Sequence, residues 1–208
     1  MKTKIKICGI TCEEDIRILN RYLPDYAGFV FAESRRRIPA ETAKKLGESL
    51  DPKIKKAGVF VNMELEQLLE VSGIAGLDAV QLHGDETQEY IERLRESFAG
   101  KTQIWKVLRI SGKNSLDAME RYKADLFLTD AYVKGVPGGS GKQFDWSLLT
   151  ELENRKNIIL AGGLNPENVS DAISTVKPYG VDVSSGVETA GKKDDLLVGE
   201  FIKKARGL

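Results

Sequence analysis

Short apolar runs alternate with longer amphipathic segments along the whole chain. In Lys4–Cys8, isoleucine alternates with lysine, which is the period-two pattern of a strand. In Glu13–Tyr22, Ile16 and Leu19 lie three residues apart and Leu23 follows four residues later, as on one face of a helix. The same change of period recurs down the chain, which predicts repeated βα units and a parallel sheet.

Eight segments have the pattern of a strand: Lys4–Cys8, Tyr26–Phe31, Ala57–Val61, Ala79–Leu82, Gln103–Leu108, Leu126–Thr129, Ile158–Ala161 and Val181–Ser184. Helices are predicted over Glu13–Tyr22, Pro39–Leu50, Glu64–Ser72, Thr87–Phe98, Asn165–Val176 and Asp194–Ala205, with a short helix at most over Ser115–Tyr122. Gly73 and Gly100 are expected to stop two of these helices. Asn165 is expected to cap another, with Pro166 at its first position.

Eight βα units can close into a (β/α)8 barrel or form an open doubly wound sheet, and periodicity fits both. The chain has 208 residues, close to the lower limit of about 200 for the barrel. A barrel therefore requires shortened helices, and we expect them around Ser115 and after Thr129. We expect residues 1–208 to form a single domain.

Composition argues against several classes of protein. Lys and Arg equal Asp and Glu at 31 each, and the zero net charge argues against a nucleic-acid groove. Cys8 and Cys12 with a single histidine cannot form a four-ligand zinc site, so no metal is expected. The N-terminal residues lack the apolar stretch of a signal peptide, and no apolar run is long enough to cross a membrane. We therefore expect a cytoplasmic protein without a membrane partner.

Reactive side chains gather at the predicted carboxyl ends of the strands, where a barrel carries its active site. These positions hold Cys8, Ser34, Arg36, Asn62, His83, Arg109, Asp130 and Asp182. A thiol and a carboxyl group facing each other across the barrel mouth would form an acid/base pair. Each residue also has a simpler interpretation: a buried small side chain for Cys8, a cap or turn for Asp130, a solvated loop for Arg36 and an ordinary polar position for His83.

Glycines follow the last two predicted strands, as Gly162-Gly163 and as Ser185-Gly186. Barrels often bind phosphate between these two loops, because glycine lets backbone N–H groups approach the anion closely. One glycine pair alone would favour a tight turn. Two such junctions, after the seventh and eighth strands, favour a phosphate site.

The whole chain resembles the phosphoribosylanthranilate isomerase family in eight segments that occur in order. They are K-I-C-G-I-T (6–11), G-F-V-F (28–31), S-x-R (34–36), G-V-F-V-N (58–62), V-Q-L-H-G (80–84), G-G-S-G-K-x-F-D-W (138–146), G-G-L-N-P-E-N-V (162–169) and D-V-S-S-G-V-E (182–188). The resemblance implies a (β/α)8 barrel that needs no cofactor or metal. It implies the conversion of N-(5′-phosphoribosyl)anthranilate to 1-(2-carboxyphenylamino)-1-deoxyribulose 5-phosphate, an Amadori rearrangement in tryptophan biosynthesis.

The resemblance also implies a role for each candidate residue. Cys8 would be the general base, Asp130 the general acid and Arg36 the ligand of the anthranilate carboxylate. The phosphate would be held by Gly162, Gly163, Ser185 and Gly186, and the site would be lined by His83 and Asp182. The stretch at 34–37 reads S-R-R-R where the family more often has an aromatic residue after S-x-R. This departure makes Arg35 and Arg37 possible substitutes for Arg36.

Three other functions fit these residues less well. A histidine-pathway Amadori isomerase would carry Asp in place of Cys8, and the same difference disfavours a dual-substrate enzyme. A barrel that binds sugar phosphates without turnover would be expected to lose Cys8 or Asp130, and both are present. The expected partner is a small phosphoribosyl substrate, for a monomer or homodimer.

Overall fold

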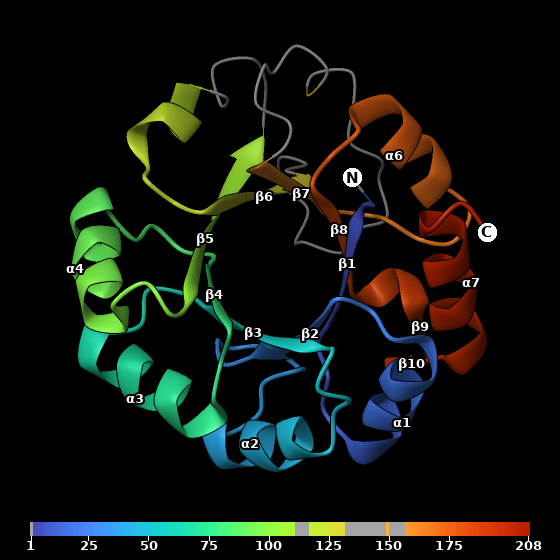
Figure 1. Cartoon of the computed structure of the whole chain (residues 1–208), viewed down its shortest axis with the longest axis horizontal. Helices are drawn as coiled ribbons and strands as arrows, with labels where there is room; N and C mark the ends of the chain where they lie inside the picture. The colour runs from blue at the N-terminus through green and yellow to red at the C-terminus, as the bar shows by residue number, and fades with distance from the viewer. Residues whose placement is uncertain (1, 111–116, 132–148, 150–156) are drawn as a thin grey trace.

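The structure is a computed structural model that describes residues 2–110, 117–131, 149 and 157–208. Eight parallel strands form a closed barrel in chain order, and β8 pairs back with β1 (Figure 1). The strands are β1 (Lys4–Cys8), β2 (Tyr26–Val30), β3 (Lys55–Phe60), β4 (Ala79–Leu82), β5 (Gln103–Ile110), β6 (Leu126–Ala131), β7 (Ile158–Leu160) and β8 (Gly180–Val183). The barrel prediction is confirmed, and the open sheet is excluded.

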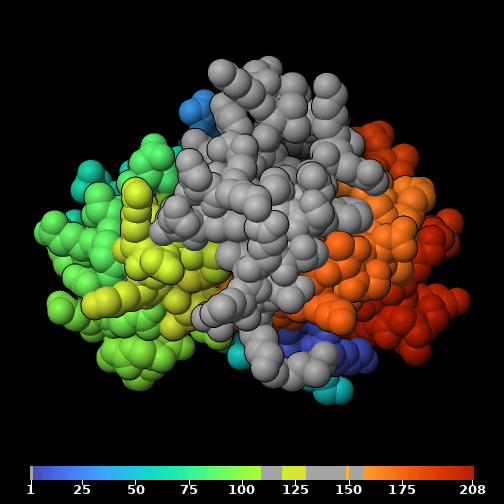
Figure 2. All heavy atoms as spheres, turned by 90° about the horizontal axis from the view of Figure 1, so that it is seen from above, coloured from blue at the N-terminus to red at the C-terminus, as the bar shows by residue number. Residues whose placement is uncertain are grey.

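Helices form a ring outside the barrel in the described part of the chain (Figure 1). They are α1 (Glu13–Tyr22), α2 (Ala40–Glu48), α3 (Leu65–Ala75), α4 (Gln88–Phe98), α6 (Val169–Val176) and α7 (Asp195–Ala205), with 3₁₀ turns η2 (Asp117–Arg121) and η4 (Ser185–Val187). In Figure 2, the green segments with α3 and α4 and the orange-to-red segments with α6 and α7 occupy opposite sides of the molecule. Within the described residues, no helix has the length and apolarity to span a membrane.

The largest differences from the predicted helix boundaries are at the end of α3 and at the start of α6. α3 continues through Gly73 to Ala75, and it is capped by Gly76, whose φ of 60° is the left-handed conformation that glycine adopts readily. α6 begins at Val169 rather than at Asn165. The side-chain oxygen of Asn165 accepts hydrogen bonds from the N–H groups of Glu167 and Asn168, so it caps a turn before the helix.

The shortened connections are only partly described. The predicted short helix near Ser115 is the five-residue η2. The segment after Thr129, including the glycine-rich sequence 135–141, lies outside the described residues, apart from the end of β6. A small hairpin that the sequence did not predict, β9 (Glu188–Thr189) with β10 (Lys192–Lys193), follows β8 and η4.

Buried apolar side chains form separate clusters on the two faces of the barrel wall. Ile5 and Ile7 belong to the large cluster that includes residues of the helices. Cys8, on the alternate face of β1, packs instead with Val30 and Val59. Because side chains alternate along a strand, Lys6 shares this inner face with Cys8.

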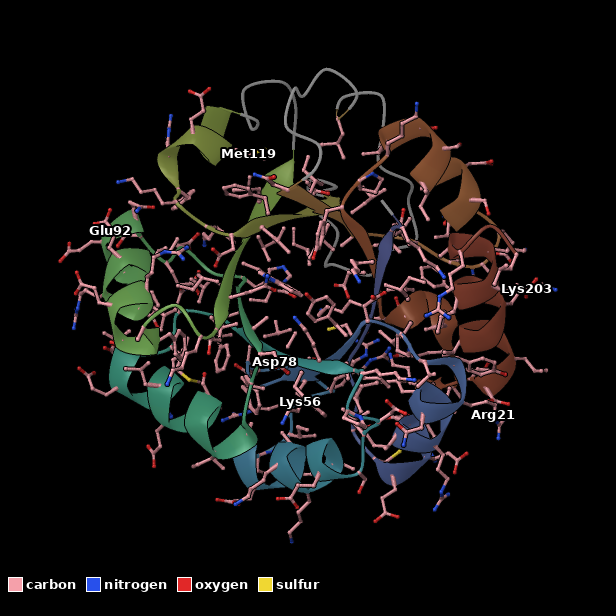
Figure 3. The ribbon with its side chains drawn as sticks, viewed as in Figure 1. Arg21, Lys56, Asp78, Glu92, Met119 and Lys203 are labelled. Carbon is pink, nitrogen blue, oxygen red and sulfur yellow. The ribbon has the colours of Figure 1, made fainter. Side chains whose placement is uncertain are left out.

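A recurring aspartate ties strands together at the end of the barrel opposite the predicted site. Asp25, Asp78 and Asp125 directly precede β2, β4 and β6. Each carboxylate accepts a hydrogen bond from a backbone N–H of the preceding strand, at 3.0, 2.7 and 2.7 Å respectively. Figure 3 shows Asp78 beside Lys56, its partner in β3, whereas Arg21, Glu92 and Lys203 lie on helices of the outer ring.

Candidate active site

Cys8 is the last residue of β1, and 8% of its surface is exposed. It pairs in register with Gly28 of β2, where a Cβ atom would lie 2.9 Å from the Cys8 sulfur. Glycine at this position therefore leaves room for the thiol. Burial raises the pKa of Cys8, because the thiolate loses solvation there, and the positive charges of Lys6 and Lys193 oppose this effect.

An ion pair inside the barrel lies next to Cys8. The Lys6 ammonium nitrogen is 2.9 Å from Oδ1 of Asp182, and the two residues pair in register on β1 and β8. Lys6 is 2% exposed. Burial lowers the pKa of Lys6, but Asp182 and Cys8 together raise it above the ordinary value, so the lysine stays charged. The structure thus brings the predicted Asp182 to Cys8 through a lysine that the sequence analysis did not single out.

Arg36 lies on the same side of the barrel mouth. A Cβ at Gly9 would be 2.3 Å from Cδ of Arg36, so the arginine packs directly over the residue after Cys8. Its Nε and Nη2 donate to the two carboxylate oxygens of Glu188 at 2.8 and 2.7 Å. Among the residues described, no hydrogen bond from Nη1 of Arg36 is found, so this edge of the guanidinium can hold a ligand.

Glu188 and Lys193 fix the position of Arg36. Lys193, in β10, donates to Glu188 at 2.6 Å and to the backbone oxygen of Ser184 at 3.1 Å. Burial would raise the pKa of Glu188, but the hydrogen bonds from Arg36 and Lys193 lower it below its ordinary value. Glu188 closes the S-S-G-V-E motif, but no sequence pattern indicates that it pairs with an arginine more than 150 positions earlier.

The three arginines at 35–37 are distinguished by their surroundings. Arg35 also reaches Glu188, but its side chain is 61% exposed against 19% for Arg36. Arg37 is exposed. Arg36 is therefore the member of the run that lies within the site, in the register expected from the sequence.

The segments after β7 and β8 touch each other. A Cβ at Gly186 would lie only 1.9 Å from the carbonyl oxygen of Leu164. Gly162 and Gly163 have φ values of 88° and 70°, a conformation that favours glycine. Within the described parts of the chain, their N–H groups donate to no hydrogen-bond acceptor. These groups can therefore bind an anion beside Ser185 and Gly186.

His83 follows β4 across the barrel from this cluster. Its Nδ1 lies 3.5 Å from Nε2 of Gln81. The next residues are held by a buried ion pair, in which Lys106 contacts Glu86 at 2.7 Å and the backbone oxygen of Gly84 at 2.7 Å. This pair lies on the helix side of β5, so it supports the His83 segment from outside the barrel.

The structure places other predicted residues only in part. Asp130 lies within β6 rather than after it, and its backbone is in register with Arg109 of β5. The side chains of both lie outside what the structure describes. The side-chain oxygens of Ser34 and Asn62 accept hydrogen bonds from the N–H groups of Arg36 and Asp85, respectively. In the described part of the molecule, no group of three or more His, Cys, Asp or Glu side chains could hold a metal ion.

Known proteins resemble this chain over nearly its full length. The family model described as "N-(5′phosphoribosyl)anthranilate (PRA) isomerase" matches residues 5–204. An N-(5′-phosphoribosyl)anthranilate isomerase of Acetivibrio thermocellus is 52% identical over 209 residues, which cover 98% of this chain and 96% of the relative.

Solved structures agree with this match. Phosphoribosyl anthranilate isomerase from Thermotoga maritima has a TM-score of 0.89 and 41% identity, covering 99% of this chain and 100% of its own. A complex of such an isomerase with reduced 1-(o-carboxyphenylamino)-1-deoxyribulose 5-phosphate has a TM-score of 0.85 and 39% identity, with the same coverage.

Proposed function

The chain belongs to the N-(5′-phosphoribosyl)anthranilate isomerase family, and from this premise we propose that Cys8 is the general base and Asp130 the general acid of its reaction. The enzyme converts N-(5′-phosphoribosyl)anthranilate to 1-(2-carboxyphenylamino)-1-deoxyribulose 5-phosphate in tryptophan biosynthesis. The reaction opens a furanose ring and then moves a proton from C2 of the sugar. Two proton transfers at different atoms call for two groups at the barrel mouth.

Asp130 acts first. Its protonated carboxyl group donates a proton to the ring oxygen while the bond from that oxygen to C1 breaks, and the nitrogen lone pair forms a C1–N double bond. The backbone of Asp130 lies at the carboxyl end of β6, the end of the barrel at which active sites are found. A carboxyl group can act as an acid at neutral pH when burial or nearby negative charge raises its pKa.

Cys8 acts second. The iminium acidifies the C2–H bond, and the Cys8 thiolate takes this proton while the bonding electrons form the C1–C2 double bond and neutralise the nitrogen. The enolamine then tautomerises to the ketone. The iminium serves as the electron sink, so the proton transfers need only side chains of this chain. Each transfer contributes about 10²–10⁴-fold to the rate.

The two ends of the substrate are held by other groups. The N–H groups at Gly162, Gly163, Ser185 and Gly186 bind the phosphate, and the Nη1 edge of Arg36 binds the anthranilate carboxylate. His83 and Asp182 line the space between. Holding the phosphate away from the reacting carbons orients the sugar, because remote binding energy positions the reacting atoms.

The observation that carries this proposal is the placement of Cys8 beside Asp182 and Arg36, next to the touching segments after β7 and β8. The test is the turnover of the Cys8→Ala and Asp130→Asn variants, which is measured by the loss of anthranilate fluorescence. We expect each variant to lose several orders of magnitude in kcat and to bind the reduced product analogue nearly as well as wild type.

Cys12→Ala is the matched control, because Cys12 is an exposed thiol at the start of α1. It should retain normal turnover. Wild-type turnover in Cys8→Ala or Asp130→Asn would remove that residue from the mechanism. Complementation of a tryptophan auxotroph lacking this step, with Cys8→Ala as the negative control, tests the same assignment in cells.

A further inference from the structure

Lys6 is a charged side chain that is almost completely buried. It is 2% exposed, and it lies two residues before Cys8 on the same, inner face of β1. A Cβ at Gly28 would lie 3.0 Å from Cε of Lys6 and 2.9 Å from the Cys8 sulfur, so both side chains pack against the same glycine. The positive charge of Lys6 opposes the effect of burial on the pKa of the thiol. Burying a charge is costly, so a buried lysine requires partners that stabilise it.

The charges around Cys8 do not cancel. Among the side chains described, the cations are Lys6 on β1, Lys193 on β10 and Arg36 after β2. The carboxylates are Asp182 on β8 and Glu188 on β9. The positions that β2 and β3 present to Cys8, Gly28, Val30 and Val59, are uncharged. Within this described set, three cations face two anions, and a Cys8 thiolate would add the third negative charge.

We propose that Lys6 is a positioning residue whose ammonium group stabilises the Cys8 thiolate, while Asp182 holds that ammonium group in place. This inference rests on the proposed function, because the thiolate matters only if Cys8 is the base. Lys6 would act through Cys8 and need not touch the sugar. Glycine at position 28 lets the lysine and the thiol lie side by side.

The proposal predicts shifts of opposite sign for the two members of the ion pair. Removing the positive charge with Lys6→Met should raise the pKa of Cys8 by about 1–3 units, the usual effect of one opposite charge within about 4–6 Å. Removing the negative charge with Asp182→Asn should lower the same pKa, because Asp182 disfavours the thiolate. If the substitutions acted only by loosening the packing, the pKa of Cys8 would shift in the same direction in both variants.

The experiment is a titration of the thiolate by its ultraviolet absorbance, in free enzyme without substrate. All proteins carry Cys12→Ala, so that Cys8 supplies the signal, and the same protein with Cys8→Ala provides the blank for tyrosine ionisation. Lys106→Met is the matched control. Lys106 is likewise 2% exposed and paired with a carboxylate at 2.7 Å, but it faces the helix layer. It should leave the midpoint of Cys8 unchanged.

Lys6→Arg keeps the charge and should restore most of the wild-type midpoint. In the Lys6→Met enzyme, the acidic limb of kcat/KM should move up by the same amount as the thiol midpoint. An unchanged midpoint in Lys6→Met, or the same direction of shift in Lys6→Met and Asp182→Asn, would overturn the proposal. If Lys6→Met does not fold, Lys6→Arg and Asp182→Asn decide by themselves.

These results separate the inference from the proposed function. The titration needs no substrate, so it reports on Lys6 even if Cys8 proves not to be the base. If the pKa of Cys8 shifts in opposite directions in Lys6→Met and Asp182→Asn while Cys8→Ala turns over normally, Lys6 stabilises the thiolate but the thiolate is not the catalytic base. If the midpoint of Cys8 is normal in Lys6→Met and Cys8→Ala is inactive, Cys8 remains the proposed base and Lys6 has no role in stabilising its thiolate.

Discussion

Gly186→Ala should separate the two segments that are proposed to hold the phosphate. The added Cβ would lie 1.9 Å from the carbonyl oxygen of Leu164, whereas a close carbon–oxygen contact is about 3.3 Å, so the segments must move apart by roughly 1.4 Å. Gly186 is not among the residues with positive φ, so the clash is steric and not conformational. A displacement of about 1 Å can reduce an enzymatic rate by about 100-fold.

We therefore expect Gly186→Ala to raise KM and to lower kcat/KM by about 100-fold. Steady-state kinetics by anthranilate fluorescence measures both, and inhibition by inorganic phosphate should weaken in parallel. Gly73→Ala is the matched control, because a Cβ at this position in α3 meets nothing within 4 Å. Alanine is also the better helix former, by about 0.5–1 kcal/mol. Unchanged KM and phosphate inhibition in Gly186→Ala would refute a phosphate site between these segments.

Three further results are expected. Glu188→Gln leaves the buried Lys193 without its counter-charge and should lower the free energy of unfolding by about 3–5 kcal/mol in urea titrations at neutral pH. Since the pKa of Glu188 is lowered in the folded state, its contribution is complete above the ordinary pKa of glutamate and is lost as pH falls through the lowered value. The difference between wild type and Glu188→Gln should therefore shrink in acid, and a constant difference would contradict this account. Lys106→Met should cost a similar amount, and Lys106→Met/Glu86→Gln should recover most of it, as seen by the same titration; no recovery would mean that packing, and not charge, dominates. Arg36→Ala should raise KM, and a defect confined to kcat would count against carboxylate binding.

The sequence predicted the elements with a strong period. β1 and α1 match their predicted bounds residue for residue, because Ile5 and Ile7 alternate with lysines and the helix has a continuous apolar face. The β9–β10 hairpin has strands of two residues each, which are too short to show any period. The start of α6 was predicted too early, because a capping asparagine has the same sequence signal before a turn as before a helix.

The predicted site residues lie at the carboxyl ends of the strands, where (β/α)8 barrels carry their active sites. The side chains that pair with them cannot be predicted from this general location. Lys6 has the sequence pattern of a solvent-facing lysine, since one polar face of a strand normally meets water. In a closed barrel that face is the interior. Lys6 lies two residues before Cys8 and therefore on the same face of β1, and this spacing was the sequence signal that could have placed Lys6 in the site. Contacts such as Arg36 with Glu188 depend on the closure of β1 against β8, which local periodicity does not encode.

The separate apolar clusters on the two faces of the barrel wall affect how this enzyme can diversify. Cohesion of the fold depends mainly on the outer cluster, which Ile5 and Ile7 join from β1. The inner positions next to them carry reactive groups and contribute little apolar contact. Exchanges of inner side chains that keep the buried charges paired should therefore open routes to new substrates at a smaller cost in folding than exchanges of the isoleucines.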